Sequence, residues 1–227
     1  LIQVLGITVL IVLINKEDGT LTLIIFNMEA KFYHWGPLLF HVKITEEDLK
    51  KLKKIILKEQ SHHKKLAGII DGQYTFKDAE KIKFGKILNS YLQEFIKVNK
   101  VYFNNYKPRN FYIDIVDVWS NFMQAGDANP VHVHKNCDWS SVLYIDIPDK
   151  LKKEQENFEG TGCGPGSIVF LTGGDIPGFV CYKDFKPAVG DFFIFPRELY
   201  HYVAPFKSKC TRVSVAANFY LKQEEIK

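Results

Sequence analysis

The C-terminal half of the chain constrains the fold most, because it is a series of short β-type segments. After Pro108, runs rich in β-branched and aromatic residues alternate with clusters of Gly, Pro, Asn and Asp, which typically form turns. We expect the strands to be residues 111–120, 140–147, 168–171, 179–182, 191–195 and 212–221. Short strands joined in this way are typical of antiparallel β-sandwiches and barrels.

Two helices are predicted before these strands. Thr45 is expected to begin the first, because its hydroxyl can accept a hydrogen bond in the first turn, and the acidic residues 46–48 favour the positive end of the helix dipole. Apolar residues at helical spacing extend this helix to Leu57 and predict a second over residues 76–98. An aromatic-rich segment, residues 28–42 with Gly36-Pro37 as a turn, suggests a lead-in strand before the first helix. The predicted fold class is therefore mainly β with N-terminal helices (α+β).

We expect one working domain, preceded by an extension. Residues 1–14 form an apolar run shorter than the about 20 residues that span a bilayer, and the run lacks the basic start and cleavage site of a signal peptide. Residues 1–27 are predicted to be an N-terminal extension, with an added hairpin as the second interpretation and a membrane anchor as the third. Residues 28–227 are predicted to be a single domain with a helical part (28–108) and a barrel (109–221).

Composition argues against two classes of partner. The net charge is +4 and no basic block stands out, so neither nucleic acid nor a membrane is favoured. The four cysteines, Cys137, Cys163, Cys181 and Cys210, include no CxxC pair, so we expect free thiols in a reducing, cytoplasmic location. Only three of the 30 basic residues are arginine, so an arginine in a candidate site indicates a specific role for that residue.

Two histidines two residues apart are the first candidate metal ligands. On an extended segment, His132 and His134 would point to the same side, close enough to hold one ion. Asp138 lies four residues later and could add a carboxylate. His201 follows a predicted strand that begins after Gly190, and it would supply a third ligand from a distant part of the sequence. Three protein ligands leave positions open for substrate and oxygen on a catalytic iron.

Arg212 and Ser214 are the candidate anion-binding residues. They lie two residues apart on the last predicted strand, so both side chains face the same side of the sheet. A guanidinium next to a hydroxyl can bind a carboxylate through two parallel hydrogen bonds. An exposed cation in this chain would normally be lysine, which favours a binding role for Arg212.

Together these motifs resemble the 2-oxoglutarate and Fe(II)-dependent dioxygenases. The resemblance covers residues 110–221 and is strongest to small bacterial and phage members with an NPxHxH segment, here residues 129–134. It implies a double-stranded β-helix, the jelly-roll barrel that cupins share. His132 and His201 match the first and last ligands of Fe(II). Arg212 and Ser214 match the site for the far carboxylate of the cosubstrate 2-oxoglutarate. The implied reaction is hydroxylation of a substrate with release of succinate and CO2.

The sequence departs from this superfamily at one ligand. Most members carry HxD where this chain has HxH. His134 takes the position of the expected aspartate, so we expect three histidines to hold the metal, with Asp138 as the alternative third ligand. A neutral third ligand leaves the iron site more positive by one charge.

Two other functions fit the sequence. HxHx3D followed by a Gly–Pro–His segment also approximates the cupin motifs, which allows a metal-binding protein or a dioxygenase without cosubstrate, but a cupin has no need of Arg212 and Ser214. A non-catalytic β-sandwich with a binding or structural role would hold no stoichiometric metal. The glycine-rich residues 160–166 lack the Gly-Lys-Ser/Thr of a phosphate loop, so we expect them to connect two strands. The substrate, a protein side chain or a small metabolite, and the oligomeric state are not specified.

Overall fold

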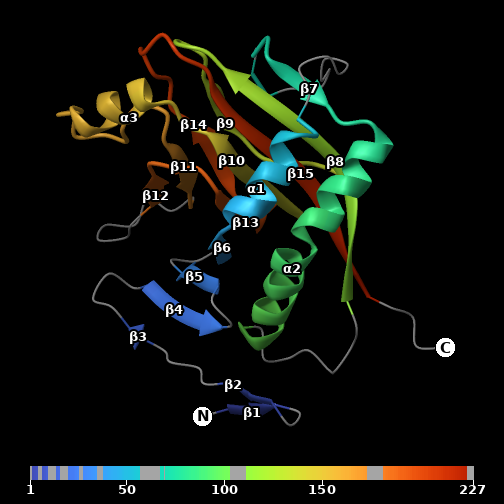
Figure 1. The fold of residues 1–227 in the computed structure, drawn as a ribbon. Helices are drawn as coiled ribbons and strands as arrows, with labels where there is room; N and C mark the ends of the chain where they lie inside the picture. Colours follow the sequence, from blue (N-terminus) through green and yellow to red (C-terminus); the bar gives the residue numbers. More distant parts are fainter. Residues whose placement is uncertain are drawn as a thin grey trace.

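The computed structural model describes residues 2–4, 7–9, 14–15, 20–25, 28–34, 38–56, 67–68, 70–102, 111–172 and 181–223 (Figure 1). The helices in these ranges are α1 (Glu46–Lys53), α2 (Asp78–Tyr102) and α3 (Asp149–Glu156). The strands up to α2 are β1 (Ile2–Val4), β2 (Ile7–Val9), β3 (Ile14–Asn15), β4 (Thr20–Ile25), β5 (Met28–His34), β6 (Leu38–Lys43) and β7 (Gln73–Thr75). The later strands are β8 (Phe111–Met123), β9 (Asn129–His132), β10 (Trp139–Asp146), β11 (Ile168–Leu171), β12 (Tyr182–Phe185), β13 (Asp191–Pro196), β14 (Tyr200–Val203) and β15 (Arg212–Gln223).

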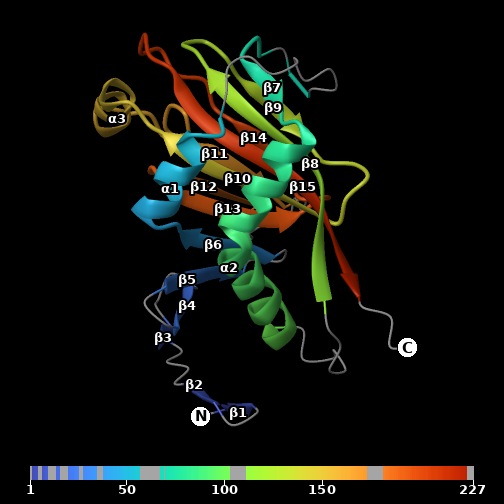
Figure 2. The same cartoon turned by 45° about the vertical axis from the view of Figure 1, so that its right-hand side comes forward.

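Most strands belong to two antiparallel sheets. The large sheet has the strand order β3-β4-β5-β6-β13-β10-β15-β8-β7, and the small sheet has the order β12-β11-β14-β9. The strands β1 and β2 pair with each other separately. Figures 1 and 2 show α1 and α2 lying against the large sheet, while the small sheet lies on its other side. The prediction of a mainly β fold with N-terminal helices is confirmed.

The helix α2 and the large sheet share one apolar core. Phe95 is almost fully buried, and its ring packs edge-on against Trp139 at 4.8 Å and Phe219 at 6.0 Å between ring centroids. Burial of a side chain of this size contributes about 1.5–3 kcal/mol. Because α2 carries such residues at helical spacing on one side, packing against the sheet orients the helix.

Alternate residues of strand β15 face opposite sides of the large sheet. Val213, Val215 and Ala217 belong to the core beneath α2, whereas Arg212 and Ser214, the alternate residues, line a cavity on the opposite side. This alternation follows from the two-residue period of a strand. It places the two candidate anion-binding side chains on the same side of the sheet, as the sequence spacing predicted, and this side faces the cavity.

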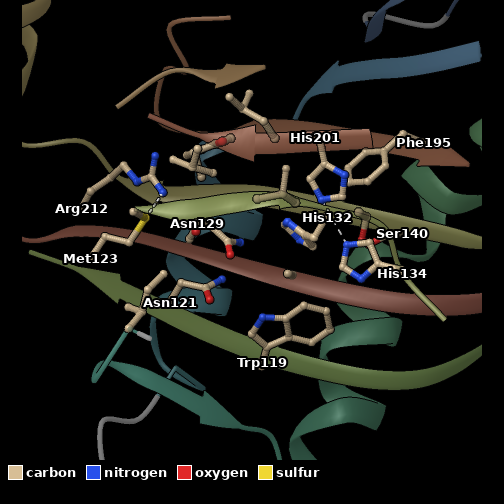
Figure 3. Close-up of a pocket in the computed structure, with 18 residues that line it drawn as sticks. Trp119, Asn121, Met123, Asn129, His132, His134, Ser140, Phe195, His201 and Arg212 are labelled. Atoms are coloured by element: carbon tan, nitrogen blue, oxygen red, sulfur yellow. Dashed lines mark hydrogen bonds between the residues drawn. The ribbon is translucent and has the colours of Figure 1, made fainter. Parts of the chain in front are cut away.

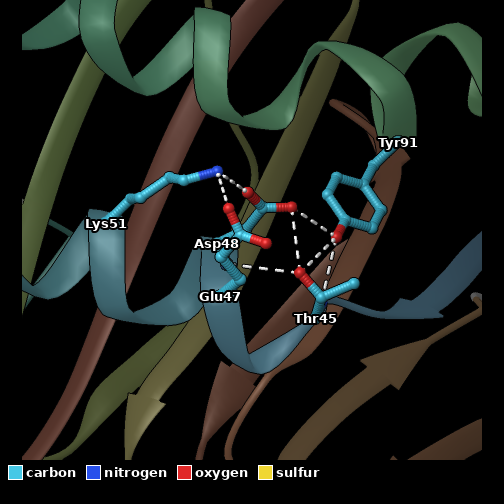
Figure 4. Close-up of polar contacts among 5 residues, drawn as sticks. All are labelled: Thr45, Glu47, Asp48, Lys51 and Tyr91. Atoms are coloured by element: carbon cyan, nitrogen blue, oxygen red, sulfur yellow. Dashed lines mark hydrogen bonds and ion pairs between the residues drawn. The ribbon is translucent and has the colours of Figure 1, made fainter.

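Helix α1 begins after the predicted cap, Thr45, and a hydrogen bond links its first turn to α2 (Figure 4). The Thr45 hydroxyl accepts a hydrogen bond from the Asp48 backbone N–H at 3.2 Å, and the Tyr91 hydroxyl on α2 donates to the Asp48 carboxylate at 2.9 Å. Burial raises the pKa of Asp48, but the hydrogen bonds from Lys51, Tyr91 and Thr45 outweigh it, so the net pKa is lowered. The helix ends at Lys53 rather than near Leu57, because the N–H of Lys54 bonds within a closing turn.

Two other sequence-based boundaries were wrong. The strand predicted at residues 179–182 lies at Tyr182–Phe185, where β12 pairs with all four residues of β11; residues 179–180 lie outside the described ranges. The glycine-rich segment 160–166 connects α3 to β11 rather than two strands, because the unpredicted helix α3 precedes it. Pairing with a neighbouring strand, a tertiary contact, decided the first of these boundaries.

The strands β3, β4 and β5 continue the large sheet beyond β6. β3 pairs with β4, β4 with β5 and β5 with β6, so the hairpin considered for this region is present in the backbone pairing. The boundary between an extension and a single domain at residue 28 stays a prediction. None of the helices in the described ranges has the combination of length and apolar character needed to cross a membrane.

Candidate metal centre and active site

Three histidines converge between the two sheets. His132 on β9 and His201 on β14 are paired across neighbouring strands of the small sheet. His134 lies two residues beyond β9, where its backbone N–H donates to the carbonyl of Arg197 at 3.0 Å. One ring nitrogen from each histidine lies within 4.8 Å of the other two, and Figure 3 shows the rings turned toward one another. The structure therefore brings together all three histidines that the sequence singled out.

The hydrogen bonds of two rings leave a nitrogen free for a metal. The Nδ1 of His132 lies 2.7 Å from the carbonyl oxygen of Pro130, and the Nδ1 of His201 lies 2.8 Å from that of Leu199. A carbonyl can only accept, so Nδ1 carries the proton in each ring and Nε2 keeps its lone pair. Carbonyls that orient ligand histidines in this way are common around metal sites.

Burial keeps these imidazoles neutral. It lowers the pKa of His132, although the Pro130 carbonyl partly opposes the shift. Burial and the neighbouring His132 lower the pKa of His134 to about 3. Burial, followed by His132 and His134, lowers the pKa of His201 well below its ordinary value. Neutral imidazole is the form that binds a metal, so the cluster is ready to accept a cation near neutral pH.

The spacing of the ring nitrogens suits a single ion. The Nε2 atoms of His134 and His201 are 3.2 Å apart. Two ligands held at about 2.1 Å from one metal would be separated by about 3.0 Å at a right angle and about 3.4 Å at a tetrahedral angle, and the observed distance lies between these values. Phe195 packs edge-on against His201 at 4.7 Å between ring centroids, which keeps one side of the cluster apolar.

Arg212 is buried without an acidic partner among the described residues. Only 1% of its surface is exposed, and Nη1 donates to the carbonyl of Gly166 at 2.8 Å while Nη2 contacts the sulfur of Met123. Its Nε has no hydrogen-bond partner. The guanidinium also lies over the ring of Tyr144 at 5.4 Å from the centroid. A buried guanidinium with a free N–H is suited to bind a carboxylate.

One cavity connects the arginine with the histidines. It has a volume of about 50 Å³, and both sheets contribute to its lining. Figure 3 shows Arg212 and Met123 at one end and the three histidines at the other, with Asn121 and Asn129 between them. An elongated molecule with a carboxylate at one end and metal-binding atoms at the other would suit this shape.

A comparison with protein families gives this arrangement a context. Residues 117–218 match the model of the family described as "Putative 2OG-Fe(II) oxygenase", and this match covers slightly less than half of the chain. Residues 117–218 belong to the 2-oxoglutarate and Fe(II)-dependent oxygenases. The cofactor and cosubstrate of this oxygenase region are accordingly Fe(II) and 2-oxoglutarate. Three neutral imidazoles fit the first, and the buried Arg212 fits a carboxylate of the second.

Solved structures of oxygenases resemble the chain distantly. A viral collagen prolyl hydroxylase from Paramecium bursaria Chlorella virus-1, solved with 2-oxoglutarate, is 15% identical, with 81% of this chain and 96% of that chain aligned at a TM-score of 0.49. A Pseudomonas putida prolyl-4-hydroxylase is 15% identical, with 65% of this chain and 70% of that chain aligned at a TM-score of 0.41. A Trichoplax adhaerens prolyl hydroxylase, in complex with a hypoxia-inducible factor peptide, is 13% identical, with 76% of this chain and 74% of that chain aligned at a TM-score of 0.43. Among curated proteins, no match to the sequence is found.

The alternative ligand Asp138 lies apart from the histidines in the oxygenase region. Its side chain is exposed, and its carboxylate accepts a hydrogen bond from the backbone N–H of Leu221 at 3.1 Å. The backbone N–H of Arg197 donates to the Asp138 carbonyl, and the Arg197 guanidinium donates to the carbonyl of Cys137. Arg197 thus ties the loop after His134 to the end of β13. Sequence reasoning gave this arginine no role.

Tyr144 is the cavity residue that sequence reasoning missed. It is fully buried on β10 opposite Ser214, and within the described part of the chain its hydroxyl has no hydrogen-bond partner. Burial raises the pKa of Tyr144 to about 12, so the hydroxyl stays protonated and can donate. Alternation along β10 could have placed Tyr144 between the sheets, but its proximity to Arg212 depends on the strand register and was not visible in the sequence.

Proposed function

We propose that the oxygenase region hydroxylates an organic substrate at the His132–His134–His201 cluster and converts 2-oxoglutarate to succinate and CO2. The observation that carries this proposal is the shared cavity, with three clustered imidazoles at one end and, at the other, a buried arginine that has no acidic partner among the described residues. Its membership of the oxygenase family supports the reaction class.

His132, His134 and His201 would hold Fe(II). With 2-oxoglutarate bound, the iron supplies the oxidising chemistry that activates oxygen. The protein's part is to fix the imidazoles and to keep them neutral. The carbonyls of Pro130 and Leu199 hold two rings in the required tautomer, and the backbone bond from His134 to Arg197 fixes the third ligand.

Arg212 would bind the far carboxylate of 2-oxoglutarate. The contact to the Gly166 carbonyl holds the guanidinium in place, while Nε remains free to donate. Ser214 lies two residues along the same strand and lines the same cavity. The Tyr144 hydroxyl, protonated and unpaired, would provide a further donor. Three donors in a buried site would favour a charged carboxylate over a neutral group.

Apolar side chains would keep bulk water from this site. Phe195 covers one side of His201, and the Trp119 ring lies 5.9 Å from that of His134. Both side chains are largely buried. Exclusion of water strengthens the electrostatic contacts of the cavity and limits side reactions of the oxidant. The two facing sheets would form a complete double-stranded β-helix, which is the fold that we propose for residues 109–221.

Anaerobic loading tests the proposal. Fe(II) is added to the purified protein, followed by 2-oxoglutarate, and the visible spectrum is recorded. A charge-transfer band is expected, because a 2-oxoacid that chelates Fe(II) through one carboxylate oxygen and the 2-oxo oxygen absorbs visible light in this way. Stoichiometric iron without this band would contradict the assignment of 2-oxoglutarate and favour a cupin-like metal protein. Failure to bind iron would favour a non-catalytic β-sandwich.

A further inference from the structure

The cavity has an unbalanced positive charge. None of the described side chains that line it is acidic, and its one permanently charged member is Arg212. Burial lowers the pKa of Arg212, but an arginine guanidinium is not deprotonated in proteins at neutral pH, so Arg212 stays charged. The histidines add no negative charge, because neutral imidazole replaces the aspartate of an HxD site.

Two carboxylates of the described ranges, Asp138 and Asp191, have partners outside the cavity. Asp138 accepts from the backbone of Leu221. Asp191 pairs with His41 and Lys43, each at 3.2 Å. With Fe(II) and doubly charged 2-oxoglutarate both bound, the cavity would therefore keep one net positive charge, whereas an aspartate ligand would make it neutral.

A hydrogen-bond donor without a partner lies at the metal end of the cavity. Ser140 on β10 is fully buried, and its hydroxyl has no hydrogen-bond partner among the described residues. Figure 3 shows Ser140 beside His134, so this hydroxyl lies at the end of the cavity where the three histidines would hold Fe(II). A buried hydroxyl without a hydrogen-bond partner destabilises the protein, and a bound group that accepts its hydrogen bond removes this cost.

We propose that the substrate of this oxygenase carries a carboxylate-type anionic group, which binds at the metal end of the cavity next to Ser140. The inference rests on the proposed function, because it counts the charges of bound Fe(II) and 2-oxoglutarate. The bound anion balances the remaining positive charge, and the Ser140 hydroxyl donates a hydrogen bond to it. A unit charge at about 5 Å and an effective dielectric constant of about 20 changes affinity on the order of 100-fold.

The test uses acetate and its neutral isostere acetamide as probes. The full chain is loaded with Co(II) and saturated with 2-oxoglutarate, and the Co(II) absorption bands are followed as each probe is added. We expect acetate to bind at least about 10-fold more tightly than acetamide. The His134→Asp variant introduces the aspartate of an HxD site and with it a negative charge. It should therefore remove the preference for acetate over acetamide. Ser140→Ala should weaken acetate binding about 3- to 10-fold without loss of metal.

Controls separate this inference from the proposed function. Asp138→Asn removes an exposed carboxylate near the same loop and should leave acetate affinity within about twofold, since solvent screens it. Failure to load the metal or 2-oxoglutarate would overturn both proposals. Normal loading with equal affinities for acetate and acetamide, or with no effect of His134→Asp, would overturn the inference alone. Chloride binding as tight as acetate binding would assign the site to a free inorganic ion and overturn the proposed substrate class.

Discussion

His132 and His201 face each other across the antiparallel strands β9 and β14, with their ring centroids 4.2 Å apart. This contact is set by the pairing of two strands and does not depend on a loop. The third histidine, His134, lies beyond the end of β9 and is held by one backbone hydrogen bond to Arg197. Two ligands are thus positioned by the sheet itself, and the identity of the third is the natural point to test.

His134→Ala should lose stoichiometric metal, whereas Asp138→Ala should retain it. The first variant removes one of three clustered ligands, and the second removes a carboxylate that is bonded to Leu221. We expect metal affinity in His134→Ala to fall by more than the about 10- to 100-fold that loss of an outer-shell partner typically causes. Metal content after dialysis, measured on both variants, checks this. The reverse result would show that Asp138 is the third ligand.

Arg212→Lys should weaken 2-oxoglutarate binding about 10- to 100-fold while the metal still binds. Lysine keeps the charge but loses the planar fork that can contact a carboxylate and the Gly166 carbonyl together. Calorimetric titration with 2-oxoglutarate measures the effect, and a thermal unfolding curve of each protein shows whether the fold is intact. Unchanged affinity in a folded variant would remove Arg212 from the site.

Tyr144→Phe should separate binding from stability. The Tyr144 hydroxyl is buried and without a partner, so its removal should leave the unliganded protein equally stable or more stable by about 1 kcal/mol. The same change should weaken 2-oxoglutarate about 3- to 10-fold, because a donor to the carboxylate is lost. Urea unfolding and ligand titration on one preparation give both quantities. A less stable variant with normal affinity would indicate a purely structural hydroxyl.

The candidate site was more predictable than the fold around it. Spacing placed Arg212 and Ser214 on one side of a strand, and the period of two that determines this is a local property of the backbone. The three histidines were found because metal binding needs nitrogen ligands, whatever the strand order. Neither conclusion required knowledge of which strands are neighbours.

Features that depend on strand register could not be predicted in this way. The contact of Arg212 with Tyr144 arises because β15 and β10 pair, and the contact with Gly166 arises because the loop before β11 reaches the same end of the cavity. Gly166 adopts a φ of +69°, which glycine tolerates and other residues rarely adopt. These are contacts between segments tens of residues apart, and no local pattern records them.

Asp191 should make the stability of the domain depend on pH. Burial raises the pKa of Asp191, but the hydrogen bonds from His41 and the Ala188 backbone and the charge of Lys43 outweigh this, so the net pKa is lowered. A carboxyl whose pKa is lower in the folded state stabilises the fold above its unfolded pKa. That contribution is lost as the pH falls through the folded value. The wild type should therefore lose stability as the pH falls below about 4.

Asp191→Asn isolates this contribution, because the amide keeps the shape of the side chain but cannot ionise. At pH 7 we expect the free energy of unfolding to fall by about 1–3 kcal/mol, the range for hydrogen bonds to a charged group. The difference between wild type and variant should shrink below about pH 4, where the carboxyl is protonated first in the unfolded state and, at lower pH, in the folded state. Urea unfolding at pH 7, 5 and 3.5 measures both. A difference that stays constant down to the lowest pH would mean that the shape of the side chain, and not its charge, stabilises β6 and β13.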